Sequence, residues 1–144
     1  MKKIFTLALA AFAVAFCSCS KDDNYSSHDI LGKWETVKVV ETYGPEKDVD
    51  DEFGEDYGYR EIFEFFEDGT GSITEMEYYS GSWHNDTEYF DYSIKGNTVY
   101  ISTYYSDYTE FKIQKLTSSE LVVKASLKED GATYTVTAYM KRIH

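Results

Sequence analysis

The chain has 144 residues, with 14 Lys and Arg against 26 Asp and Glu, and a formal net charge of −12. This excess of acid excludes a basic surface for nucleic acid or anionic lipid head groups, because it repels phosphates. Both cysteines lie within the first 19 residues, so the remaining chain has no disulfide, no thiolate nucleophile and no sulfur ligand for zinc.

The N-terminal segment has the pattern of a secretory signal. Lys2 and Lys3 precede an uncharged run from Ile4 to Phe16, which is followed by small residues beside a cysteine. The run is shorter than the roughly 20 residues that span a bilayer. A buried core helix is the alternative, and the polar segment that follows disfavours it. We therefore expect residues 1–18 to be an export signal.

The junction Ser18-Cys19 resembles the lipobox of bacterial lipoproteins, in which a small residue precedes a cysteine that becomes lipidated. Cys17 fits this pattern less well because it follows the bulky Phe16. The resemblance implies that Cys19 carries the acyl chains and anchors the protein in a membrane essentially permanently. A cleaved secretory peptide with a free cysteine is the alternative.

The residues after Cys19 are Ser20, Lys21, Asp22 and Asp23. They resemble the signal that sends lipoproteins of Bacteroidota-type Gram-negative bacteria to the outer face of the outer membrane. The alternative is a solvated, charged tether on the periplasmic face. We expect residues 19–29 to form a polar tether and residues 30–144 a single domain.

The composition of that domain favours β-structure, because 17% of the whole chain is aromatic, with 14 tyrosines, and there is a single proline. Alternating apolar residues and turn residues predict strands over residues 30–42, 59–67, 70–79, 88–94, 98–104, 108–116, 120–127 and 132–142. Asp68-Gly69 predicts a type I′ hairpin turn, and residues 80–86 read as a loop.

Residues 44–58 contain seven acids and one lysine and predict an exposed loop. An EF-hand that starts at Asp48 is excluded, because its sixth position would be Phe53 where the turn requires glycine. A looser calcium site is the alternative to a solvated acidic loop.

Eight consecutive strands with short connections predict an antiparallel meander. We expect an all-β fold, an eight-stranded antiparallel up-and-down β-barrel, because closure removes two exposed edges; an open sandwich is the alternative. The alternation places these residues on the inner face: Phe63, Phe65, Val99, Ile101, Phe111, Ile113, Leu121, Val123, Ala125, Leu127, Tyr134, Val136, Ala138 and Met140. A barrel of this size is either filled by such side chains or holds one small ligand.

Gly32-Lys33-Trp34 resembles the Gly-x-Trp signature of lipocalins, and the chain from residue 30 is similar to the lipocalin-like domains of bacterial lipoproteins. The resemblance implies a lipocalin-like barrel whose floor is closed by Gly32 and Trp34, with Arg142 packing over the tryptophan. Ser106-Asp107-Tyr108 resembles the family's Thr-Asp-Tyr motif, but it stands before the sixth strand rather than after it.

No catalytic residues are predicted, and we expect neither an enzyme nor a cofactor nor a metal site. His28, His84 and His144 are scattered along the chain without the spacing of zinc ligands. Aromatic residues gather at strand ends and in loops, where binding residues are common. These candidate ligand-binding residues, which we call the aromatic cluster, are Tyr78, Tyr79, Trp83, Tyr89, Tyr104, Tyr105 and Tyr108; the alternative is that tyrosine simply suits strands and wet barrel ends.

The sequence thus predicts a monomeric, lipid-anchored binding protein on the outer membrane, facing the cell surface or the periplasm. We expect it to bind a small apolar or aromatic-stacking ligand at the barrel mouth. The alternative is a protein- or glycan-interaction module in which a filled barrel supports the acidic loop and the aromatic cluster.

Overall fold

The computed structural model describes residues 24–43, 49–103, 109–129 and 132–144. Cys19 and the predicted export signal Ser20 to Asp23 lie outside these residues and stay predictions. The elements are α1 (Ser27–Ile30), β1 (Gly32–Tyr43), β2 (Val49–Glu52), the 3-10 helix η1 (Glu55–Tyr57), β3 (Tyr59–Phe65), β4 (Thr70–Tyr79), β5 (Ser82–Lys95), β6 (Thr98–Thr103), β7 (Thr109–Leu116), β8 (Glu120–Glu129) and β9 (Ala132–Ile143).

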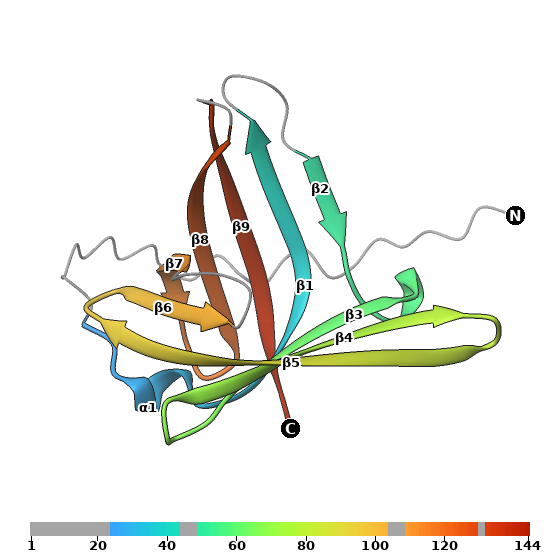
Figure 1. Cartoon of the computed structure of the whole chain (residues 1–144), viewed down its shortest axis with the longest axis horizontal. Helices are drawn as coiled ribbons and strands as arrows, with labels where there is room; N and C mark the ends of the chain where they lie inside the picture. The colour runs from blue at the N-terminus through green and yellow to red at the C-terminus, as the bar shows by residue number, and fades with distance from the viewer. Residues whose placement is uncertain (1–23, 44–48, 104–108, 130–131) are drawn as a thin grey trace, which may run out of the picture.

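The strands form one antiparallel sheet that closes on itself. Its order is β2-β1-β3-β4-β5-β6-β7-β8-β9, and β9 also pairs with β1. Eight strands therefore make a closed barrel, to which β2 is added. In Figure 1, β1, β8 and β9 rise together, whereas β3, β4 and β5 run across beneath them. The prediction of a closed barrel is confirmed, and the open sandwich is excluded.

Of the predicted loop over residues 44–58, residues 44–48 lie outside the described residues, and the prediction is wrong for residues 49–52 and 55–57, which form β2 and η1. β2 pairs with the second half of β1, with Val39 opposite Asp51, whereas β3 pairs with the first half, with Trp34 opposite Phe63. The backbone N–H of Phe53 donates to the carbonyl of Val37 at 3.2 Å and continues this edge. Pairing with β1, rather than strand propensity, holds the acidic segment extended.

The predicted loop over residues 80–86 is also wrong. β5 begins at Ser82, directly opposite Tyr79, so the turn is only Ser80-Gly81. Both turn residues have positive φ, 52° and 82°, as a type I′ turn requires. The result is a long β4–β5 hairpin, which reaches the right-hand side of Figure 1.

The turn between β3 and β4 differs from the type I′ turn predicted at Asp68-Gly69. Of the two residues only Gly69 has a positive φ, 86°, and its N–H donates to the carbonyl of Phe66 at 3.3 Å. The Asp68 carboxylate instead accepts hydrogen bonds from the backbone N–H and the hydroxyl of Thr70, at 2.9 and 2.7 Å. This local side-chain interaction favours the longer turn.

The segment before β1 is folded against the barrel in its described part. The N–H of Tyr25 donates to the carbonyl of Gly96 at 2.9 Å. Residues 27–30, expected as the end of a tether and the start of a strand, form α1 instead, and Ile30 at its end is fully buried. A four-residue helix has no period that a sequence pattern could reveal.

The core lies inside the barrel and follows the predicted alternation. β8 and β9 pair Leu121 with Met140 and Val123 with Ala138. The fully or nearly fully buried apolar residues are Ile30, Trp34, Phe65, Phe90, Tyr92, Val99, Ile101, Ile113, Leu121, Val123, Ala125 and Met140. They gather toward the end of the barrel that α1 covers.

Candidate functional site

The barrel floor is built around Trp34, whose side chain is fully buried. Its indole N–H donates to the carbonyl of Ile30 at 2.7 Å. The guanidinium carbon of Arg142 lies 4.1 Å from the centroid of the Trp34 ring, within cation–π distance. Arg142 also donates to the carbonyl of Leu31 and, at 2.8 Å, to that of Ser118. These bonds fasten the end of β9 over the floor.

Gly32 is required at this floor for two reasons. Its φ of 103° is a conformation that side-chain-bearing residues rarely adopt. A Cβ at this position would also lie 2.9 Å from Nη1 of Arg142. Gly32, Trp34 and Arg142, the three floor residues predicted from the lipocalin resemblance, therefore lie together.

Above the floor lies an interior cavity of about 320 Å³. The apolar residues that line it come from both halves of the chain: Ile30, Val39, Phe53, Phe63, Phe65, Val99, Ile101, Phe111, Leu121, Val123, Val136, Ala138 and Met140. The remaining lining residues are Glu41, Asp51 and Glu61. The volume lies at the lower end of the range of small-molecule sites, about 300 to 1,000 Å³. The described barrel is therefore hollow rather than filled.

The three acids, which we call the acidic wall, lie on β1, β2 and β3, which are neighbours in the sheet. Asp51 is exposed, and Glu41 and Glu61 are half-buried, whereas Ile30 at the other end of the cavity is fully buried. Along β1, Asp51 and Glu41 thus lie toward the solvent end of the cavity, and Glu61, beside the buried Thr36, lies between them and the apolar floor.

Glu61 is the most constrained of the three acids. Its Oε1 accepts a hydrogen bond from the buried hydroxyl of Thr36 at 2.7 Å. Burial raises the pKa of Glu61 and the charge of Glu75 raises it further, although the Thr36 hydrogen bond acts in the opposite direction. The pairing register of β3 and β4 places Glu75 directly opposite Glu61. A negative charge at Glu61 is therefore poorly compensated.

Tyr59 lies next to these acids on the same face of β3. Burial, followed by the charges of Glu75 and Glu61, raises the pKa of Tyr59 to about 12. The Tyr59 ring also packs against Phe53, with ring centroids 5.3 Å apart. The solvent end of the cavity therefore combines aromatic rings with negative charge.

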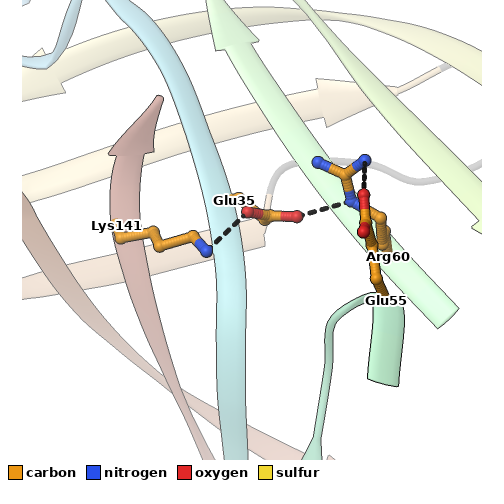
Figure 2. Close-up of polar contacts among 4 residues, drawn as sticks. All are labelled: Glu35, Glu55, Arg60 and Lys141. Atoms are coloured by element: carbon orange, nitrogen blue, oxygen red, sulfur yellow. Dashed lines mark hydrogen bonds and ion pairs between the residues drawn. The ribbon is translucent and has the colours of Figure 1, made fainter. Parts of the chain in front are cut away.

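A second polar cluster lies on the outward side of β1, β3 and β9, with Glu55 of η1 beside it (Figure 2). Glu35 accepts a hydrogen bond from Nε of Arg60 at 2.6 Å and pairs with Nζ of Lys141 at 2.9 Å, and Arg60 reaches Glu55 at 3.4 Å. Burial raises the pKa of Glu35, but the hydrogen bonds and charges of Lys141 and Arg60 outweigh it and leave the pKa lowered. Because its charges are paired, this cluster joins β9, β1 and β3 rather than offering a binding group.

The described members of the aromatic cluster lie away from the cavity. Tyr78 and Trp83 face each other near the end of the β4–β5 hairpin, with ring centroids 5.4 Å apart. Tyr79 stacks on His84 at 3.8 Å. Tyr89 is on the outward face of β5 and is 71% exposed. None of these four lines the interior cavity, so a role for them in binding stays a prediction.

Tyr104, Tyr105 and Tyr108 lie outside the described residues, as do Ser106 and Asp107, and their assignments stay predictions as well. In the described ranges, no three His, Cys, Asp or Glu side chains are grouped so that they could hold a metal ion. Within those same ranges, no helix is long and apolar enough to cross a membrane.

The acidic wall was not predicted as a site. The sequence pattern predicts Asp51 only as part of an acidic loop, and Glu41 and Glu61 only as strand residues. Glu61 did carry a signal, since it alternates with Phe63 and Phe65 and so shares their inward face. The signal for Glu41 is hidden by an irregularity of β1 that shifts the register between Thr36 and Lys38.

Several solved structures are similar to this chain. Bovine odorant-binding protein from nasal mucosa is 21% identical over 86% of this chain and 77% of its own, with a TM-score of 0.48. A complex of the bovine odorant-binding protein with undecanal gives 21% identity over 85% and 76%, with a TM-score of 0.47. The bovine lipocalin allergen Bos d 2 gives 14% identity over 81% and 75%, with a TM-score of 0.49.

No curated protein matches the chain. The model of the lipocalin-like domain family matches residues 30–123, which is more than half of the chain and includes the Gly32-Lys33-Trp34 signature and all three acids of the wall. With its closed eight-stranded barrel and its floor of Gly32, Trp34 and Arg142, this chain belongs to the lipocalin-like domain family.

Proposed function

We propose that this protein is a lipid-anchored, non-enzymatic binding protein that holds a small, largely apolar ligand inside its barrel. The observation that carries the proposal is the interior cavity of about 320 Å³. The lipocalin-like fold is typical of proteins that bind small hydrophobic ligands. The cavity supports a ligand inside the barrel, and a contribution of the aromatic cluster at the barrel mouth stays a prediction.

The lining supports an apolar ligand of modest size. Val99, Ile101, Phe111 and Leu121 offer aliphatic and aromatic surface on one side, and Phe63 and Phe65 offer aromatic surface on the other. Burying apolar ligand surface against them contributes roughly 25 cal/mol per Å² removed from water, before the cost of association. The closed floor gives the ligand one route of entry, through the end that carries the acidic wall.

Filling the cavity should weaken binding and leave the fold intact. Ala138 points inward from β9 and lines the cavity, so Ala138→Trp would place an indole in the ligand's space. We expect the affinity for a neutral, apolar fluorescent probe such as N-phenyl-1-naphthylamine to fall at least about tenfold. A tenfold fall corresponds to a loss of about 1.4 kcal/mol in binding free energy. Fluorescence titration measures it.

The matched control is Ser126→Trp, which adds the same side chain to the exposed outer face of β8. This control should bind the probe as the unmodified protein does, and circular dichroism should show that both variants are folded. Equal probe binding by Ala138→Trp and the unmodified protein would show that the ligand does not enter the cavity.

The membrane anchor is part of the proposal and is supported by the lipobox-like junction at Cys19. Cys19→Ala should move the protein from the membrane fraction to the soluble fraction, because acyl chains supply the attachment. Fractionation followed by immunoblotting measures this. Ser18→Thr, which keeps the cysteine and a small neighbour, is the control. A Cys19→Ala protein that stays in the membrane fraction would refute the anchor.

The face of the membrane is also a proposal, supported by Ser20, Lys21, Asp22 and Asp23. If these residues direct the protein to the cell surface, protease added to intact cells should digest it. If the protein faces the periplasm, digestion should require that the outer membrane be opened first.

A further inference from the structure

Charge and apolar surface are unevenly distributed in the cavity. The only charged side chains that line it are the three acids of the acidic wall, and among the described lining residues there is no Lys, Arg or His. The acids lie on the neighbouring strands β2, β1 and β3, whereas the floor and the walls formed by β6 to β9 are apolar. A ligand that fills this cavity must therefore place some part of itself beside carboxylates.

The negative charge continues along the same inward face beyond the cavity. The register places Glu75 beside Glu61 and Asp86 beside Glu75, across β3, β4 and β5. Glu88 lies on this face as well, opposite Ile73, and its Oε1 is buried without a hydrogen-bond partner in the described part of the structure. Glu88 does not line the cavity, so it adds to the acidic character of this face without contacting a ligand inside the barrel.

The acidic wall discriminates among three classes of apolar ligand. A fatty acid would bring a carboxylate into a cavity whose described charged lining residues are all acids, and like charges repel. A neutral ligand would seal Glu61 from water without compensating its charge. An organic cation would pair with the acids, and the rings of Phe53 and Phe63 beside them add cation–π attraction. Only the cation gains from both features.

We infer that the natural ligand is an amphipathic organic cation, an amine with an apolar body, whose body lies against Phe65, Leu121 and Met140 and whose ammonium group lies beside Glu61. The inference rests on the proposed function, since it uses the same cavity. Thr36 fixes the orientation of Glu61 by donating to one of its oxygens and leaves the other oxygen to accept from the ammonium group.

Three probes of equal chain length separate the classes: n-decylamine, 1-decanol and decanoate, at concentrations below micelle formation. Each is titrated against the full-length protein loaded with N-phenyl-1-naphthylamine, and the displacement of this neutral probe is followed by fluorescence at neutral pH. We expect decylamine to displace it at about tenfold lower concentration than decanol, because a charge-assisted hydrogen bond is worth about one decade in affinity. Decanoate should be the weakest of the three.

Glu61→Gln tests the assigned residue, because the amide keeps the shape and the hydrogen bond from Thr36 but removes the charge. This variant should lose most of the preference for decylamine over decanol while its affinity for decanol stays the same or rises. Glu64→Gln is the matched control on the same strand, since Glu64 faces outward and pairs with Lys33 at 3.9 Å; it should keep the full preference.

The outcomes separate the inference from the proposed function. If all three probes displace the dye equally well, the cavity binds apolar molecules without regard to charge, and the inference is overturned while the proposed function stands. If decanol or decanoate is preferred, the inference is overturned in the same way. If the dye itself does not bind, the proposed function falls together with the inference.

Discussion

Trp34→Ala should lower the free energy of unfolding by about 3–5 kcal/mol, the range for truncating a large buried aromatic residue. Trp34 is fully buried at the floor, where it packs under Arg142 and donates a hydrogen bond to Ile30. Its removal leaves a void at the closed end and takes away the surface on which Arg142 rests. Urea unfolding followed by far-ultraviolet circular dichroism measures the loss.

The chain contains its own control for this prediction, because its second tryptophan, Trp83, lies on the β4–β5 hairpin and packs only partly, against Tyr78. Trp83→Ala should change the free energy of unfolding by less than about 1 kcal/mol, as is usual for a side chain outside the core. Equal losses for the two variants would contradict the assignment of Trp34 as the centre of the floor.

The closed barrel could be predicted from the sequence because its evidence is local. Strands such as Glu120 to Leu127 place an apolar residue at every second position, Leu121, Val123, Ala125 and Leu127, and turns such as Thr117-Ser118-Ser119 carry the residues that turns need. Closure of the sheet into a barrel could be predicted because the unpaired edge strands of an open sheet promote aggregation. These properties are visible in the residues themselves, and the structure confirms them.

The predictions that are wrong concern two segments whose structure depends on pairing with another strand rather than on their own residues. Residues 49–52, with the sequence VDDE, have no apolar alternation and become β2 only because β1 offers an edge to them. Residues 82–86, with the sequence SWHND, are rich in turn formers and become strand because β4 lies opposite. Tertiary context overrode propensity in both segments.

The acidic wall could not be predicted as a whole because its register depends on a bulge. Counting alternate residues from Trp34 and Thr36 would bring Lys38 and Val40 to the inner face. The register shift between Thr36 and Lys38 instead places Lys38 opposite Tyr139 and turns Val39 and Glu41 inward. Because of the extra residue in β1, Glu41 rather than Lys38 faces the cavity, and this part of the lining is acidic rather than basic.

The cavity volume could not be predicted from the sequence either, since an eight-stranded barrel is compatible with a filled or a hollow interior. The outcome depends on how side chains of different size meet across the barrel. Phe65, Phe90 and Tyr92 fill the lower end, with ring centroids 5.0 to 6.4 Å apart. Small residues such as Ala138 leave space above them.

Glu35→Gln should destabilise the protein by about 2–3 kcal/mol at neutral pH, because it removes a buried charge from between two cations. Glu35 is 5% exposed and joins three strands through Arg60 on β3 and Lys141 on β9. A glutamine offers one acceptor oxygen in place of two, and its amide group would face a cation. Thermal and urea unfolding measure the loss.

The stabilisation that Glu35 contributes should depend on pH in one definite direction. The pKa of Glu35 is lower in the folded protein than in the unfolded chain, so the unfolded chain binds the proton more tightly and acid favours unfolding. The stabilisation from Glu35 is fully present above the unfolded pKa of a glutamate, about 4.3, and is lost as the pH falls through the lowered, folded pKa. The unmodified protein and Glu35→Gln should therefore converge in stability in acid.

Glu61→Gln is the matched variant with the opposite expectation. The pKa of Glu61 is raised in the folded protein, so its stabilisation is fully present below the unfolded pKa and is lost as the pH rises through the folded one. Replacing Glu61 should therefore stabilise the protein at neutral pH, because the uncompensated charge disappears and Thr36 keeps an acceptor. The contrast between the paired, outward Glu35 and the poorly compensated, inward Glu61 would be wrong if both variants were less stable than the unmodified protein at neutral pH and stayed less stable in acid.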